Sequence, residues 1–415
     1  MKHIRKSLTV LLLVLSVLLA GIVSRGETVY ALPEEPDLMS QFAILQDPDT
    51  GQVLYEENAD QRMYPASMTK VMTGILAIEN LKDLDEEVTI SQEMLYDLIS
   101  RNASVAGYTP GMKATVRDLL YALLLPSGAD AANALAIKTA GTLPKFAEMM
   151  NAKAAEIGMN HSHFENAHGL HEDSHYTTAR DFLKLMNYAR QNELFCEILA
   201  AESYQAKLKE FKSIAWSQIG PGYVDFPGFQ GGKTGFTGYA GLCFAFFAEK
   251  DGMKLTGVIA GCPGEYETYN HLRTAGKLAA WGFDNYRRYK APEEPMLIGT
   301  VHVEHKFKEE DIPVYAKFEF ESDILKGNDP AVAVQLPNHV QSTNSAQNIT
   351  VYARLMNGDE VLEVREVTVT VPREPNFFVR FFRTFGKPLG VLAGVLVIAA
   401  AVLIIRKKFY RRRRL

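Results

Sequence analysis

The sequence predicts an α+β domain, in which helices pack on an antiparallel sheet, then a small all-β sandwich domain and a C-terminal transmembrane helix. Helix-like and strand-like segments both occur before residue 291, and short turn signals rather than long crossovers join the strands. Helix signals disappear between residues 296 and 372, where strands dominate. An uncharged apolar run then follows near the end of the chain.

The first residues have the pattern of a secretory signal peptide. Three basic residues precede an apolar run from Leu8 to Val23, and the small residues at Val29 and Ala31 suit a cleavage site. We therefore expect residues 1–31 to be a signal peptide and the mature chain to begin at Leu32. An uncleaved membrane anchor is the alternative that this pattern leaves open.

The C-terminal residues have the pattern of a single membrane span. Residues 388–405 carry no charge, and their length is at the short end of the roughly 17–25 residues that cross a bilayer. The basic tail at 406–415 predicts a cytoplasmic end, and the segment 373–387, rich in Phe and Arg, is typical of a juxtamembrane region. We expect a single-pass protein of the cell membrane, with the chain from Leu32 to about residue 375 on the cell-wall side.

The segment outside the membrane is acidic. Between Leu32 and Pro372 the chain has 29 Lys and Arg residues against 47 Asp and Glu residues. Such a surface repels polyanions, so we expect no nucleic-acid partner. The three cysteines are too few for a disulfide framework. A Cys243–Cys262 bridge stays open as an alternative to two free buried thiols, which we favour.

Residues 32–291 are expected to form the α+β domain. Two hairpins, at 42–56 and 239–262, are predicted from their Gly-containing turns. Helices are predicted at 67–79, at 116–140 with a break at Pro126-Ser127-Gly128, and at 144–159, 177–201 and 266–288. Residues 296–372 are expected to form the small β-sandwich.

One short motif has a spacing that suits catalysis. Ser67 and Lys70 are three residues apart at the start of a predicted helix, so their side chains point the same way, one turn apart. A serine hydroxyl is a weak nucleophile until a base takes its proton, and a neutral lysine amine at this spacing can do so. Short motifs also arise by chance, so this one needs companions.

Two further segments supply candidate companions. Lys233-Thr234-Gly235 stands where a strand begins, and an extended peptide can dock along such a strand by β-addition, with Thr237 offering a further hydroxyl. Ser127 lies at the break between two predicted helices. The alternatives are a solvated lysine in a loop-to-strand turn and a serine that merely caps a helix.

A histidine-rich segment raises the question of a metal site. Its members are His161, His163, His168, His171 and His175. Zinc sites need fixed ligand geometry with supporting carboxylates, and Glu165, Glu172 and Asp173 are close in sequence. The spacing is not His-Glu-x-x-His, so we favour polar packing of a loop over zinc. We expect no metal and no cofactor.

The motifs together resemble a known family. Ser-x-x-Lys with a second serine motif and Lys-Thr-Gly is the signature of penicillin-binding proteins and class A β-lactamases. From about Ser40 to Tyr286, and on through the β-rich segment, the chain resembles the low-molecular-mass penicillin-binding proteins, the serine D-alanyl-D-alanine carboxypeptidases. Further segments that resemble them are Phe164–Leu170, His175–Asp181 and Trp281–Phe283. The resemblance implies a β-lactamase/transpeptidase-like fold for residues 32–291.

The resemblance also implies a role for each motif residue. Ser67 would form the acyl-enzyme, Lys70 would be the general base, and Ser127 would relay protons to the leaving amine. Substrate binding would involve Lys233, Thr234, Gly235 and Thr237. Because Lys70 must be neutral to accept a proton, we expect a depressed pKa, caused by partial burial and by nearby Lys233.

Two positions depart from the family pattern. Ala129 stands where an Asn is expected in the middle motif, and Asp130 or Asn133 could take over part of its role. His271 stands where an Arg that helps to bind the substrate carboxylate is expected, with Arg273 nearby. Both departures bear on efficiency and on substrate preference.

The activity that the resemblance implies is removal of the terminal D-alanine from peptidoglycan stem pentapeptides. Those peptides are the expected partners, and β-lactams are the expected inhibitors. A non-catalytic sensor of wall peptides or of penicillin is the alternative that Ala129 raises. A β-lactamase is a further alternative, but we find no carboxylate at a recognisable deacylating position.

Overall fold

The computed structural model describes residues 33–207, 209–306, 308–374 and 377–412. The predicted signal peptide, residues 1–31, lies outside this part of the chain, as do the last residues of the basic tail. Two compact units are present. The first, called here the α+β unit, contains the chain up to Lys290 together with Glu321–Asp329. The second, the β-rich unit, contains Ala291–Phe320 and the chain from Pro330 onward.

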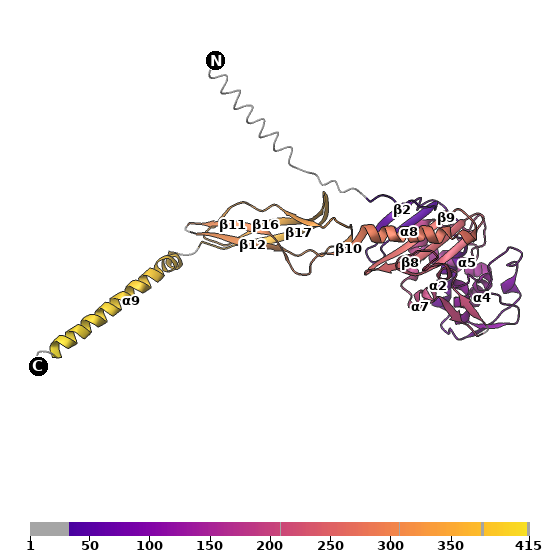
Figure 1. Ribbon diagram of the computed structural model, residues 1–415, viewed down its shortest axis with the longest axis horizontal. Coiled ribbons are helices and arrows are strands. Elements are labelled where there is room, and N and C mark those ends of the chain that lie inside the picture. The colour runs from indigo at the N-terminus through magenta and orange to yellow at the C-terminus, as the bar shows by residue number, and fades with distance from the viewer. Residues whose placement is uncertain (1–32, 208, 307, 375–376, 413–415) are drawn as a thin grey trace, which may run out of the picture. The chain divides into compact units, whose positions relative to one another are not determined.

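The α+β unit is built on a five-stranded antiparallel sheet (Figure 1). Its strands have the order β2-β1-β9-β8-β7, so β7 lies at an edge. Both predicted hairpins are present: β1 pairs with β2, and β8 pairs with β9. The strands are β1 (Phe42–Gln46), β2 (Val53–Glu57), β7 (Phe229–Thr237), β8 (Gly241–Lys250) and β9 (Met253–Cys262).

Helices cover both faces of this sheet, because successive strand residues point to opposite sides. Ala43 and Leu45 join the core beneath α8 (Asn270–Asn285), while Ile44 joins the core on the other face. The helices of that second core are α2 (Lys70–Asn80), α3 (Val116–Leu124), α4 (Ala129–Ala140), α5 (Leu143–Glu156), α6 (Ala179–Ala189) and α7 (Glu193–Ala200). The prediction of one helix over 177–201 is wrong. The Asn192 side chain accepts a hydrogen bond from the amide of Phe195 and so starts a new helix, α7.

Short elements complete the α+β unit. Those between β2 and β7 are η1 (Ala66–Thr69), β3 (Glu87–Thr89), η2 (Glu93–Leu95), β4 (Lys113–Thr115), β5 (Ser203–Gln205), β6 (Glu210–Lys212) and η3 (Trp216–Gln218). After β9 come η4 (Tyr266–Thr268) and β10 (Tyr286–Lys290). Cys243 and Cys262 are free, buried thiols, as we favoured, and burial raises the pKa of both to about 12. They therefore stay protonated and inert near neutral pH.

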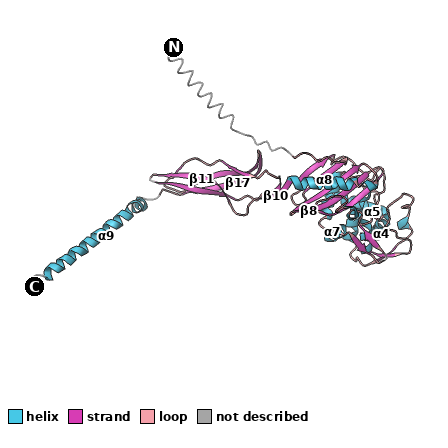
Figure 2. Ribbon diagram, viewed as in Figure 1, coloured by secondary structure: helices cyan, strands magenta, loops and turns pink. Residues whose placement is uncertain are grey.

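The β-rich unit contains two three-stranded sheets, drawn as magenta strands in Figure 2. Their strand orders are β12-β11-β15 and β14-β16-β17. Valines of both sheets share one apolar cluster, with Val301 and Val303 from one sheet and Val351 and Val369 from the other. The strands are β11 (Met296–His305), β12 (Lys308–Ala316), β14 (Ala331–Val334), β15 (Val340–Gln341), β16 (Gln347–Asn357) and β17 (Glu360–Val371).

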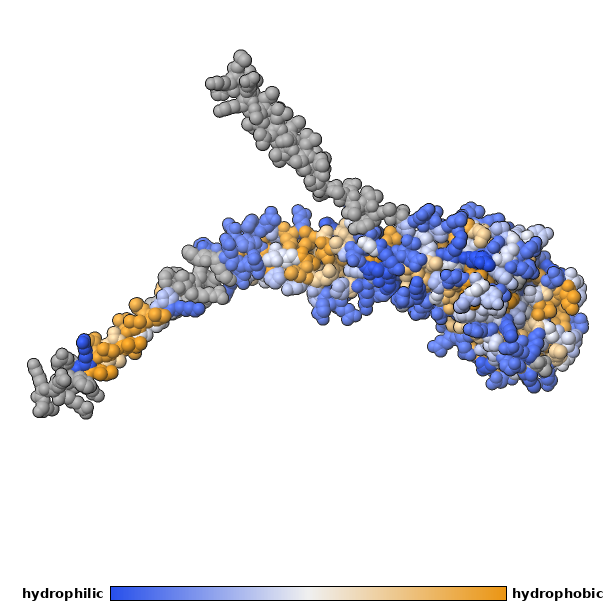
Figure 3. Space-filling model, in the orientation of Figure 1, coloured by the Kyte–Doolittle hydropathy of each residue, from blue (hydrophilic) through white to orange (hydrophobic). Residues whose placement is uncertain are grey.

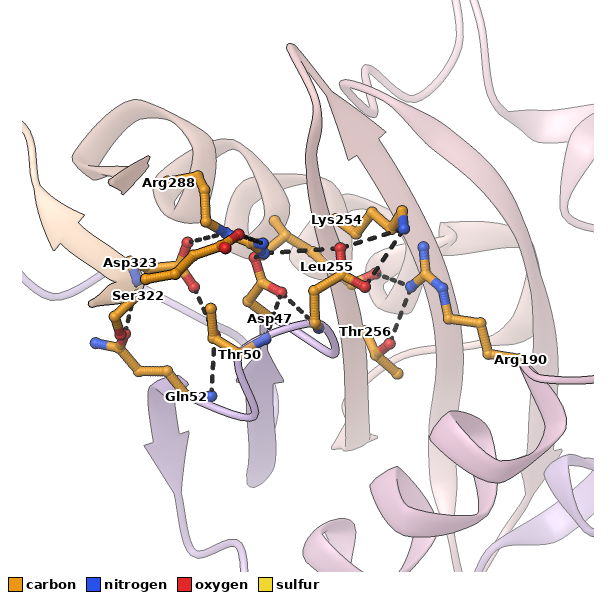
Figure 4. Close-up of polar contacts among 12 residues, drawn as sticks. Asp47, Thr50, Gln52, Arg190, Lys254, Leu255, Thr256, Arg288, Ser322 and Asp323 are labelled. Atoms are coloured by element: carbon orange, nitrogen blue, oxygen red, sulfur yellow. Dashed lines mark hydrogen bonds and ion pairs between the residues drawn. The ribbon is translucent and has the colours of Figure 1, made fainter. Parts of the chain in front are cut away.

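One strand of the predicted 296–372 segment belongs to the other unit. β13 (Glu321–Leu325) pairs antiparallel with β10. Arg288 of β10 ties both strands to the β1–β2 turn: its guanidinium contacts Asp47 and lies 3.3 Å from a carboxylate oxygen of Asp323 (Figure 4). Both carboxylates are fully buried, so the arginine offsets two buried charges. The hydroxyl of Thr50 also donates to Asp323, at 2.9 Å.

The helix α9 (Phe377–Arg412) is apolar over most of its length, and apolar side chains run along it in Figure 3. The stretch Gly386–Arg406 has a mean hydropathy of 2.8, and none of it is buried. By length and composition this stretch is able to cross a membrane. The structure thus contains a candidate span where the sequence predicts one, at 388–405.

Candidate active site

Ser67 lies in a 3-10 turn rather than in the first turn of an α-helix. The turn η1 leads directly into α2, of which Lys70 is the first residue. Residues three apart eclipse one another in a 3-10 helix, and Lys70 Nζ lies 2.9 Å from Ser67 Oγ. The structure therefore brings the two predicted residues together through a tighter turn than we expected.

The backbone of this turn is strained, and a neighbouring loop holds it. Ala66 has φ of 47°, in the left-handed region that non-glycine residues avoid. Gly169 approaches so closely that a Cβ there would stand 1.8 Å from the carbonyl oxygen of Ala66. Asn166 fixes this loop: its Oδ1 accepts from the amide of Gly169 at 2.7 Å, and its Nδ2 donates to the carbonyl of Leu170 at 3.0 Å.

Lys70 is buried, and its surroundings favour the neutral amine. Burial lowers the pKa of Lys70 to about 7, although the nearby charge of Asp130 acts in the opposite direction. Lys70 Nζ also donates to the carbonyl oxygen of His168 at 2.7 Å. A neutral amine that donates one N–H in this way has its lone pair left to accept the Ser67 proton. The expected depression of the pKa of Lys70 is confirmed, and burial is its cause; Lys233, which we also expected to lower it, is not among the causes.

The strand β7 carries a second buried lysine into the site. Lys233 Nζ donates to Ser127 Oγ at 3.0 Å and to the carbonyl oxygen of Thr234 at 3.0 Å. Burial, with the charge of Lys70 adding to it, holds the pKa of Lys233 well below its usual range. Ser127 does not cap α4, because Gly128 is the N-cap residue. The backbone of Ser127 itself is left-handed, with φ of 64°. The helix-capping alternative for Ser127 is therefore excluded.

Gly235 lets β7 approach the turn that carries Ser67. A Cβ at Gly235 would stand 3.0 Å from the carbonyl oxygen of Pro65 and 3.2 Å from Ala66 Cβ, closer than a side chain is normally packed. Thr237 ends the strand. Its Oγ1 accepts from the amide of Ala240 at 3.0 Å, which leaves the hydroxyl proton free to donate.

The structure does not support either residue that we considered as a replacement for the missing Asn. The carboxylate of Asp130 accepts hydrogen bonds from the three backbone amides of Ala106–Tyr108, at 2.7, 2.8 and 3.0 Å, and so fixes that loop; it also accepts from the amide of Ala131 at 3.0 Å. Asn133 Nδ2 donates to the carbonyl of Met94 at 3.2 Å. Ala129, which is 1% exposed, adds no polar group to the site.

His271 cannot supply the positive charge of the expected arginine. It is buried in α8, with its ring edge-on to Phe244. Burial and the charge of Lys233 lower the pKa of His271 to about 4, so the ring is neutral near pH 7. Arg273, two residues further along, is exposed to solvent.

The histidine-rich segment packs against the site through hydrogen bonds. His175 is buried, and its Nδ1 accepts from the amide of Glu165 at 3.1 Å. The ring proton is therefore on Nε2, which donates to Thr69 Oγ1 at 2.8 Å. His168 Nδ1 accepts from the amide of Leu170 in the same loop. These contacts are those of polar loop packing, which we favoured, and His175 supports the residue next to Lys70.

Sequence reasoning missed this supporting layer of Asn166, Gly169 and His175. All three lie in segments that resemble the family, and that resemblance was the only signal that could have found them. The contacts of Gly169 with Ala66 and of His175 with Thr69 join residues about a hundred positions apart, and Asn166 holds the loop that makes the first of them. Local patterns in a sequence do not predict such pairings.

The fold places a buried lysine amine against a serine hydroxyl, an arrangement that suits a serine hydrolase. The model of the D-alanyl-D-alanine carboxypeptidase family matches residues 30–264, and the chain belongs to this family. The D-alanyl-D-alanine carboxypeptidase of Streptomyces sp. strain K15 is 32% identical, over 56% of this chain and 84% of its own length. The carboxypeptidase DacF of Bacillus subtilis is 29% identical, over 64% of this chain and 67% of its own.

Solved structures agree with the fold. The Streptomyces K15 DD-transpeptidase is 29% identical and superposes with a TM-score of 0.55, covering 60% of this chain and 99% of that protein. Penicillin-binding protein 5 of Haemophilus influenzae, at 24% identity, has the same fold with a TM-score of 0.61 over 83% of this chain and 99% of that protein. The fold that the sequence predicts for the α+β domain is thereby confirmed.

The close approach of Gly169 to Ala66 yields a prediction. Gly169→Ala should lower the free energy of unfolding by about 1–3 kcal/mol more than Gly158→Ala, because overpacking adds to the shared cost of a positive φ. Gly158 is the matched control: its φ is 78°, against 85° at Gly169, but a Cβ added at Gly158 would meet no atom within 4 Å. Urea unfolding measures both variants. Equal losses would show that the contact with Ala66 is unimportant.

Proposed function

We propose that this protein is a serine D-alanyl-D-alanine carboxypeptidase that removes the terminal D-alanine from peptidoglycan stem peptides through an acyl-enzyme on Ser67. The observation that carries the proposal is the buried Lys70, with its amine 2.9 Å from Ser67 Oγ and its pKa lowered to about 7. Membership of the D-alanyl-D-alanine carboxypeptidase family supports the choice of substrate.

In the first half of the reaction, Lys70 takes the hydroxyl proton as Ser67 Oγ attacks the carbonyl carbon of the penultimate D-alanine. The backbone amides of Ser67 and Thr237 stabilise the oxyanion. When the C–N bond breaks, Ser127 gives its proton to the leaving amine and takes one from Lys233 Nζ, which lies 3.0 Å from Ser127 Oγ. The proton that Lys70 took from Ser67 then passes to Lys233, so Lys70 is neutral again for the second half.

In the second half, water replaces the departed D-alanine. Lys70 takes a proton from this water as its oxygen attacks the ester carbonyl carbon, and the bond to Ser67 Oγ breaks. Ser67 recovers its proton, and the shortened peptide leaves with a new carboxylate. A β-lactam follows the same first half, with its strained amide as the acylating bond, and it remains attached to Ser67 when water cannot complete the second half.

The substrate carboxylate binds at Lys233 and Thr234, and the rest of the peptide lies along the edge of β7 toward Thr237. Because His271 is neutral, the positive charge for this carboxylate comes from Lys233. Lys233 has a depressed pKa in the free protein. An arriving carboxylate raises that pKa, so substrate binding is coupled to protonation of Lys233.

The remaining domains deliver and hold this enzyme at the cell wall. We propose that residues 1–31 are a cleaved signal peptide, that 296–372 form a β-sandwich spacer interrupted by β13, and that 373–387 lead into a membrane span at 388–405 with a cytoplasmic tail at 406–415. The apolar stretch Gly386–Arg406 supports the span. Deleting residues 377–415 should move the protein from the membrane fraction to the soluble fraction, and retention in the membrane would contradict the anchor.

The proposed acyl-enzyme is tested on one sample by two measurements. Intact-mass analysis after benzylpenicillin should show one covalent adduct on the wild-type protein, and the same protein should release D-alanine from a pentapeptide. Ser67→Ala should lose both activities by at least about a thousandfold, since it removes the nucleophile. Ser217→Ala, which removes an exposed serine in η3, is the control.

The outcomes separate the proposal from its alternatives. An adduct without release of D-alanine, even at high enzyme concentration, would favour a penicillin or wall-peptide sensor, the alternative that Ala129 raises. Hydrolysis of penicillin much faster than hydrolysis of the peptide would favour a β-lactamase. Full activity in Ser67→Ala would refute the acyl-enzyme.

A further inference from the structure

Three aromatic rings from different segments of the α+β unit contact one another in succession. His171 stacks on Tyr239, with ring centroids 3.8 Å apart and an angle of 10° between the ring planes. The ring of Tyr64 meets His171 edge-on, at 4.7 Å and 84°. Tyr239 is 73% exposed although one of its faces is covered, so its other face is open to solvent. Such a face is a surface on which a ligand can stack.

Each ring belongs to a segment that also holds part of the proposed catalytic machinery. Tyr64 precedes the turn that carries Ser67. His171 follows the loop whose carbonyl oxygen accepts from Lys70. Tyr239 lies two residues after the end of β7. These three rings, which we call the aromatic platform, are therefore carried by three segments that also carry residues of the site.

The aromatic platform is held in place by hydrogen bonds before any ligand arrives. The hydroxyl of Thr237 accepts from the amide of Ala240 and so closes the turn that presents Tyr239. Arg101 donates to the carbonyl oxygen of His171 at 2.8 Å and pairs with Glu172 at 2.9 Å. A surface fixed in this way loses little conformational entropy when a ligand binds to it.

The direction of the docked peptide places part of it over the platform. We consider a peptide bound antiparallel to β7, with its terminal carboxylate at Lys233 and Thr234. The earlier residues of such a peptide lie progressively closer to the C-terminal end of β7. The residue before the D-alanyl-D-alanine pair therefore passes Thr237 and reaches Tyr239.

We propose that the aromatic platform is a subsite for the acyl group carried by the penultimate D-alanine. In a stem peptide this group is the residue before the D-alanyl-D-alanine pair, and in a penicillin it is the acyl side chain. The subsite selects for a phenyl ring or a chain of methylene groups, because these bury apolar surface against the ring of Tyr239. The proposal rests on the proposed function. It adds a preference for the group that precedes the D-alanyl-D-alanine pair, which the sequence motifs leave open.

Two β-lactams that differ only in this group test the subsite. Benzylpenicillin carries a phenylacetyl group, and 6-aminopenicillanic acid carries a free amine in its place. In the full-length protein, Tyr239→Ala should lower the ratio of their second-order acylation rate constants roughly tenfold, the loss expected for one apolar contact. Using the ratio cancels any effect on the shared chemical step.

Two control variants accompany Tyr239→Ala. Tyr239→Phe keeps the stacking face and should restore the wild-type ratio. Tyr223→Ala removes a tyrosine that is 66% exposed, and its neighbours Val224 and Phe226 belong to the core on the α8 face of the sheet. It should leave the ratio at its wild-type value. Melting temperatures confirm that each variant is folded.

A peptide pair gives an independent measurement. Tyr239→Ala should raise KM severalfold for diacetyl-L-lysyl-D-alanyl-D-alanine, with kcat little changed, and should affect acetyl-glycyl-D-alanyl-D-alanine less. Two results would overturn the subsite. If Tyr239→Ala weakened both β-lactams equally, or both peptides equally, Tyr239 would only position the end of β7. If the variant changed neither the acylation rate constants nor KM for any compound, Tyr239 would make no contact with the ligand. A wild-type protein that neither β-lactam acylates would refute the proposed function itself, and the subsite with it.

Discussion

The burial of Lys70 is the constraint on which the rest of the site depends. An ammonium group that is removed from water is costly, and at Lys70 the nearby charge of Asp130 offsets only part of that cost, which releasing the proton relieves. The pKa of Lys70, lowered to about 7, is the result. Lys70 is buried beneath the strained turn at Ala66, which Gly169 approaches closely. The carbonyl oxygen of His168 accepts from its amine and so helps to orient it toward Ser67. A more open turn would return the lysine to solvent and remove the base.

The second buried lysine extends the same principle to substrate binding. Burial, with the charge of Lys70 adding to it, lowers the pKa of Lys233, and His271 adds no positive charge of its own. The two lysines therefore carry less positive charge than their number suggests, and in the proposed function a carboxylate would induce that charge when it binds. In the proposed function this coupling would tie recognition of a free C-terminus to the protonation state of the two lysines.

Local patterns in the sequence predicted that Ser67 and Lys70 lie side by side, and they predicted the two hairpins and most helices, because spacing and turn chemistry are local properties. They did not predict the 3-10 turn at Ser67, since a Ser-x-x-Lys spacing fits both helix types. They did not place β13, which pairs with β10 through residues more than thirty positions apart. They also misjudged Asp130, whose carboxylate binds three backbone amides of a loop that only the tertiary fold brings close.

The account is tested most directly by the pH dependence of acylation. The second-order rate constant for benzylpenicillin reports the free enzyme, so it should rise through an inflection near pH 7 and then level off as Lys70 loses its proton. Lys70→Arg, whose guanidinium stays protonated, should be inactive over the whole range. A rate constant that is flat between about pH 5.5 and 8.5, or one that rises only near the ordinary lysine pKa of about 10.4, would contradict the central claim that burial makes Lys70 a neutral base.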